Sequence, residues 1–120
     1  MRTEAADVFD VMVDGVLCID TEHLDRQTMG DAQLRTEILG LYQRQARLAL
    51  FRLTATTSAT EVRELAHSIK GASLGIGAQR VAEAAHQLEE NAVRLPFDQL
   101  DIRCVSDAIE DTLVTIETLI

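Results

Sequence analysis

Apolar residues recur along most of this chain at spacings of three and four, the pattern of helices that bury one face. Four long segments show it, and they cover residues 32–53, 59–74, 79–93 and 99–120. A shorter helix is expected from Asp20, as its N-cap, to about Thr28, with Gly30 closing it. The alternation typical of strands is scarce, and the chain has one proline. The pattern predicts an all-α fold.

Residues suited to helix ends separate these segments. Asp31 can cap the helix 32–53, Ser58 with Glu61 forms a capping box for the helix 59–74, and Asp98 can cap the last one. Gly75 and Gly77 are interpreted as the end of the second long helix and the turn after it, and Pro96 ends the third segment. Short connections between four long helices predict an antiparallel up-and-down four-helix bundle formed by residues 20–120 as a single domain.

The periodicity also predicts which side chains face the core. The expected inward positions are Leu34, Ile38, Leu41, Tyr42, Ala49 and Leu53; Val62, Leu65, Ala66, Ile69, Ala72 and Ser73; Val81, Ala85, Leu88 and Ala92; and Ile102, Val105, Ile109, Thr112, Leu113, Ile116 and Ile120. Residues 1–19 form a lead-in that covers the bundle. Two conformations stay open for it, a short helix or an extended apolar segment, with an apolar set of Val8, Phe9, Met12, Val13 and Val16.

The composition of the chain excludes several classes of function. With 120 residues, 47% of them apolar, the chain fits one domain, and its net charge of −9 argues against a general role in nucleic-acid binding. No apolar run approaches the roughly 18 residues that span a membrane. The acidic N-terminal residues are unlike a secretory signal, and two cysteines, Cys18 and Cys104, make no disulfide framework. These features predict a cytoplasmic protein with reduced thiols.

The stretch 64–81 (ELAHSIKGASLGIGAQRV) carries the candidate chemistry. At 100° per residue, His67 points roughly 160° away from the predicted core face, and its outward neighbours are Arg63, Glu64, Lys70, Gly71 and Leu74. A neutral imidazole is a competent nucleophile near pH 7, and a cation one turn later can stabilise phosphoryl oxygens. Glycine inside a helix costs about 1 kcal/mol, which suggests that a partner must approach there. The pattern predicts a phosphoryl-accepting site.

The segment Ala66-His67-Ser68-Ile69-Lys70-Gly71, followed by Gly77 and by Leu88-Glu89, resembles the histidine-containing phosphotransfer (HPt) domain family. The resemblance covers about residues 19–93 in pattern and the rest in architecture. It departs from the family at Ile69, at Ala72, where a serine hydroxyl is missing, and at Gly75. These changes affect fine positioning rather than the reactive group.

The resemblance implies a phosphorelay intermediate rather than an enzyme with an ATP site or autokinase activity. His67 would accept the phosphoryl group from a receiver-domain aspartate, Lys70 would stabilise it, and Gly71 would give clearance. The expected partner-binding residues are Arg63, Glu64, Leu74 and Glu89. The implied partners are receiver domains of response regulators and hybrid histidine kinases, which would supply a divalent metal, whereas the chain, a monomer, would need no cofactor of its own.

Two other interpretations stay open. A non-phosphorylated helical adaptor could bind the same two-component proteins, although it would not need the nucleophile. A di-metal carboxylate bundle is suggested by the pairs Glu64-x-x-His67 and Glu83-x-x-His86, with further ligands from Glu37 and Glu110 or Glu117. Its ligands would have to face the interior, whereas the angles place both histidines outward.

Overall fold

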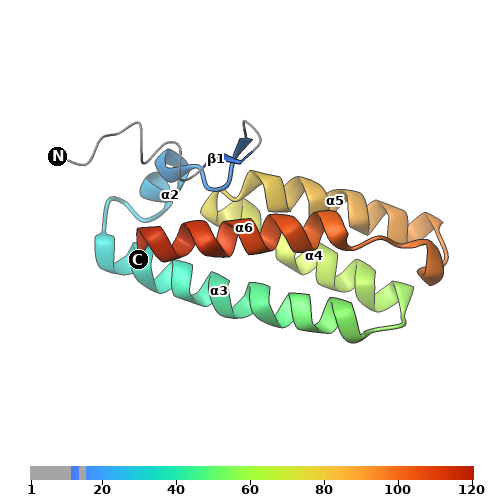
Figure 1. Ribbon diagram of the computed structural model, residues 1–120. Helices are drawn as coiled ribbons and strands as arrows, with labels where there is room; N and C mark the ends of the chain where they lie inside the picture. The colour runs from blue at the N-terminus through green and yellow to red at the C-terminus, as the bar shows by residue number, and fades with distance from the viewer. Residues whose placement is uncertain (1–11, 14–15) are drawn as a thin grey trace.

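The computed structural model describes residues 12–13 and 16–120, and it confirms the predicted all-α bundle with an additional short N-terminal helix. Figure 1 shows the long helices lying side by side, with α2 at one end of the bundle. The elements, in chain order, are β1 (Met12–Val13), β2 (Val16–Leu17), α2 (Thr21–Gln27), α3 (Ala32–Ala55), α4 (Ala59–Ile76), α5 (Gln79–Arg94), the 3₁₀ turn η1 (Phe97–Gln99) and α6 (Arg103–Leu119).

Three of the four predicted N-caps are confirmed. The side chains of Asp20, Asp31 and Ser58 each accept a hydrogen bond from the backbone of the first turn of their helix. The prediction of Asp98 as the fourth cap is wrong, because Asp98 lies in η1, a turn closed by backbone hydrogen bonds from residues 99 and 100. The helix α6 begins only at Arg103, whose backbone N–H donates to Asp101 Oδ1 at 2.9 Å.

The core lies between the four long helices, and most expected inward positions are buried or half-buried. Leu41 is an exception, because 58% of it is exposed. It follows the fully buried Leu39 by two residues, which is about 200° around a helix, so the two cannot share a face. Ile120, beyond the end of α6, is also exposed, at 52%.

The turn between α4 and α5 closes one end of the bundle. The helix α4 continues through Gly75 to Ile76, two residues further than predicted, and Gly77 ends it with a φ of +80°. The Asp20 N–H donates to the Gly77 carbonyl at 2.8 Å, and a Cβ on Gly77 would lie 2.9 Å from the Asp20 carbonyl oxygen. Only glycine fits there, because the backbone is left-handed and Asp20 packs against it.

The described residues of the N-terminal segment, 12–13 and 16–19, precede Asp20, which contacts the turn between α4 and α5. Met12–Val13 pair antiparallel with Val16–Leu17, which is an extended conformation for these residues, and the apolar positions Val8 and Phe9 lie outside the described residues. Cys18 and Ile19 are fully buried. In the described part of the chain, no helix has the length and apolarity required to cross a membrane.

Candidate functional site

His67 lies on the outer side of α4, as the angular spacing predicts. Its side chain is 69% exposed, whereas Ala66 and Ile69 on either side of it are buried in the core. The helix is therefore held by its inner face, and the imidazole is presented to solvent. A substitution of His67 should leave the packing of the bundle intact.

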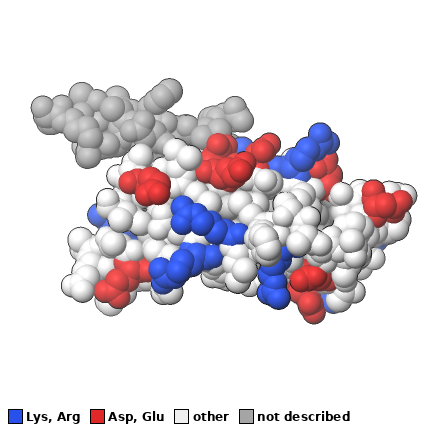
Figure 2. Space-filling model, turned by 60° about the horizontal axis from the view of Figure 1, so that its bottom comes forward, with Lys and Arg blue, Asp and Glu red and all other residues white. Residues whose placement is uncertain are grey.

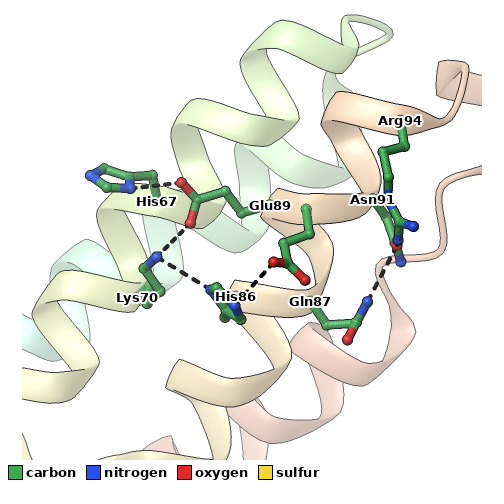
Figure 3. A network of polar contacts seen from close by, with 8 residues as sticks. His67, Lys70, His86, Gln87, Glu89, Asn91 and Arg94 are labelled. Carbon is green, nitrogen blue, oxygen red and sulfur yellow. Dashed lines mark hydrogen bonds and ion pairs between the residues drawn. The ribbon is translucent and has the colours of Figure 1, made fainter.

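Glu89 of α5 joins the two site residues of α4 (Figure 3). Its carboxylate lies 2.8 Å from His67 Nδ1 through Oε2 and 2.7 Å from Lys70 Nζ through Oε1. Hydrogen bonding from Lys70 lowers the pKa of Glu89; burial opposes this shift, and the hydrogen bond from His67 adds to it. Glu89 is therefore ionised at neutral pH and can only accept hydrogen bonds.

This acceptor fixes the tautomer of the imidazole. Because a carboxylate cannot donate, Nδ1 of His67 carries the hydrogen of the 2.8 Å contact. The lone pair of a neutral ring then lies on Nε2, and Figure 3 shows that this second nitrogen points away from Glu89. The arrangement presents a nucleophilic nitrogen atom to an approaching partner.

Lys70 is less exposed than its predicted place on the outer side of α4 suggests. Its side chain is only 23% exposed, and it is held by Glu89 and by His86 Nδ1, at 3.5 Å from Nζ. His86 in turn lies 3.4 Å from Glu90 through Nε2. Sequence reasoning missed this chain of contacts across α4 and α5, although the spacing of His86 and Glu90 by four residues was a usable signal.

Within the described structure, no side-chain hydrogen bond or ion pair joins His67 to the remaining predicted site residues of α4. Arg63 and Glu64 are exposed on the preceding turn, and Leu74, two turns after His67, is 54% exposed. A Cβ built on Gly71 would meet no described atom within 4 Å, so packing within the domain does not demand a glycine. Beside Leu74, an open groove of about 730 Å³ lies between α4 and α5.

The di-metal interpretation fails on orientation. His67, His86 and the proposed carboxylates Glu37, Glu110 and Glu117 are all exposed, whereas its ligands would have to converge inside the bundle. Among residues 12–13 and 16–120, no group of three metal-ligating side chains is close enough to hold an ion.

The exposed histidine and the four-helix frame agree with the comparison to protein families. The model of the Hpt domain matches residues 26–118. The chain belongs to the HPt family. HPt domains are phosphocarrier modules with a phosphotransfer role in two-component signalling, and the family interacts with receiver domains. Neither the curated proteins nor the solved structures that were compared gave a match to this HPt domain.

Proposed function

We propose that this HPt domain is a phosphorelay intermediate, which accepts a phosphoryl group on Nε2 of His67 from a receiver-domain aspartate and passes it to a second receiver. The observation that carries the proposal is the exposed imidazole whose Nδ1 is bonded to the Glu89 carboxylate at 2.8 Å. That bond directs the lone pair of the ring outward, where a phosphoryl donor can reach it.

The reaction needs only groups that the two partners would hold. Nε2 attacks the phosphorus of an aspartyl phosphate, the N–P bond forms, and the P–O bond breaks so that the aspartate leaves as a carboxylate. Because Nδ1 keeps its hydrogen, the ring becomes positively charged. The Glu89 carboxylate stabilises this charge, and the same steps in reverse release the phosphoryl group.

The surface around His67 is proposed as the docking surface for the receivers. Gly71 gives the clearance for close approach, while Arg63, Glu64 and Leu74 contact the partner. The divalent metal of the reaction belongs to the receiver, in which carboxylates hold it beside the aspartate. We propose that the domain works as a monomer in the cytoplasm.

The test is chemical phosphorylation of the purified domain with phosphoramidate, followed by intact mass and NMR of the imidazole nitrogens. We expect one acid-labile phosphoryl group on Nε2 of His67, its absence in His67→Gln, and its retention in the matched variant His86→Gln. The labelled domain should then lose its phosphoryl group to a receiver domain in the presence of Mg²⁺. Label on His86, or a labelled His67 that no receiver can discharge, would refute the relay function.

A further inference from the structure

Charged residues are distributed unevenly along this acidic chain, and the helix α3 carries a net positive charge. The chain has 20 acidic and 11 basic residues, yet no acidic residue occurs between Glu37 and Glu61. That interval holds three arginines, and all of them lie on exposed positions of α3. Figure 2, which turns the lower side of Figure 1 toward the viewer, shows blue side chains across the middle of the molecule and red ones mainly toward its edges.

The same side of α3 exposes large apolar side chains. Leu41, Leu48 and Phe51 are 58%, 56% and 69% exposed. At 100° per residue they and the three arginines lie within about 140° of the helix circumference. We call this set the α3 face; its members are Leu41, Arg44, Arg47, Leu48, Phe51 and Arg52. Clustered apolar residues with basic neighbours are typical of a surface that binds a partner.

The α3 face is continuous with the phosphorylation site. Gln45, which adjoins it, donates from Nε2 to Ser68 Oγ at 3.4 Å, and Ser68 directly follows His67. A hollow of about 240 Å³ between α3 and α4 is lined by Leu48 and Arg52 on one side and by Leu65 and Ser68 on the other. A protein that covers His67 from this side therefore also contacts α3.

We propose that the α3 face is a docking surface for the phosphoryl-exchanging receiver and that it binds an acidic, partly apolar surface of that receiver. This inference rests on the proposed function. Charge complementarity decides the occupant. Lys70 at the site is neutralised by Glu89 at 2.7 Å, and Arg52 lies 3.9 Å from Glu61, so Arg44 and Arg47 supply most of the attraction of the α3 face to a partner rich in carboxylates. Their field should accelerate association, and salt should weaken it.

The experiment measures phosphotransfer from the domain, labelled on His67 with phosphoramidate, to a receiver domain. The receiver is chosen from a panel as the one that discharges the wild type fastest. The charge variant is Arg44→Glu with Arg47→Glu. Its matched control is Arg26→Glu with Arg94→Glu, which makes the same change of net charge on α2 and α5. For the apolar part, Leu48→Ser is compared with Val114→Ser on α6, a residue that is 67% exposed.

We expect the charge variant to lower kcat/KM about tenfold at low salt, with the difference shrinking at high salt, while the control falls far less. Leu48→Ser should raise KM, and Val114→Ser should leave it unchanged. Phosphoramidate labelling should proceed equally in every variant, because it needs no partner; loss of labelling in the wild type would refute the proposed function instead.

Three results would overturn the inference. The first is equal transfer by the charge variant and its control. The second is a wild-type dimer, seen by light scattering, that the charge variant dissociates, since the α3 face would then join two copies of the chain. The third is binding of the wild type, but not of the charge variant, to vesicles of anionic phospholipid.

Discussion

Replacing Gly71 by alanine should stabilise the domain and slow its reaction with a receiver. Gly71 lies inside α4, and an added Cβ would meet no described atom within 4 Å. The substitution therefore changes helix propensity without adding a clash or a packing contact, which predicts a gain of about 1 kcal/mol. For a domain of this size the melting temperature should rise by roughly 3–5 °C.

Gly40→Ala is the matched control. Gly40 lies inside α3, and its added Cβ would meet only the end of the Arg44 side chain, at 3.8 Å, so a similar gain in stability is expected. Thermal and urea denaturation followed by circular dichroism measure both variants. A third variant, Gly71→Gln, carries the longer side chain that should obstruct a docked partner.

The assay compares a small phosphoryl donor with a protein donor. Phosphoramidate should label His67 equally in the wild type and all three variants, since it reaches Nε2 from solvent. Transfer to a receiver should be slower in Gly71→Ala and slowest in Gly71→Gln, and unchanged in Gly40→Ala. Lower stability of Gly71→Ala would show that the glycine serves the fold, and wild-type transfer by Gly71→Gln would refute the clearance role.

Three further predictions concern single contacts. Burial raises the pKa of Tyr42 from 10.0 to about 12, and the hydrogen bond to Ser73 opposes part of this shift. The protonated phenol therefore stabilises the folded state fully below pH 10, and this stabilisation is lost as the pH rises toward 12. Because Tyr42 is the one tyrosine, phenolate absorbance measures its pKa directly, and a midpoint near 10 would contradict the prediction. Gly77→Ala should cost at least about 2 kcal/mol in urea denaturation, because its φ is +80° and its Cβ would lie 2.9 Å from Asp20, whereas Gly30→Ala, with a φ of +73° and open space, should cost less. Glu89→Ala should slow labelling by phosphoramidate about fivefold, the equivalent of about 1 kcal/mol for an exposed charge-assisted hydrogen bond, and an unchanged rate would remove Glu89 from the reaction.

Most of the fold could be predicted from the sequence because local signals and burial agree. Asp31 and Ser58 each stand directly before a periodic apolar segment, so the cap and the pattern locate the same boundary. They disagree after Pro96, where Asp98 is a suitable cap but α6 begins only at Arg103, with Ile102 as its N-cap. The backbone hydrogen bonds of η1 delay the start of the helix, and these depend on how the chain turns between α5 and α6.

For the site, the sequence predicts what depends on a single helix but not what depends on how two helices pack together. The exposure of His67 follows from the period of one helix, since the core side of α4 is rich in apolar residues. The position of Lys70 does not, because it depends on the register between α4 and α5, which brings Glu89 within 2.7 Å of the ammonium. Sequence spacing within each helix contains no information about that register. The resemblance to the HPt family placed Glu89 near the site, but as a partner-binding residue.

The contacts of Glu89 lead to a last prediction, about Lys70. In the unmodified domain the carboxylate is shared between Lys70 Nζ and His67 Nδ1. When Nε2 carries a phosphoryl group, the ring is cationic and becomes the stronger partner of Glu89, so Lys70 should turn toward the phosphoryl oxygens. In the absence of a receiver, Lys70→Ala should then shorten the lifetime of the phosphohistidine, whereas Arg63→Ala, which removes an exposed cation from the same side of α4, should leave it unchanged.

The measurement is the loss of label after phosphoramidate is removed, followed by intact mass without a receiver and then with one. Lys70 lies 2.7 Å from Glu89 and 3.5 Å from His86, so the alanine variant could also act by leaving Glu89 without its cation. Lys70→Arg separates the two effects, because arginine restores the charge beside Glu89 but presents it as a planar fork. A normal lifetime in Lys70→Ala would show that the ammonium serves only to neutralise Glu89, and the stabilisation of the phosphoryl group would then have to come from the receiver.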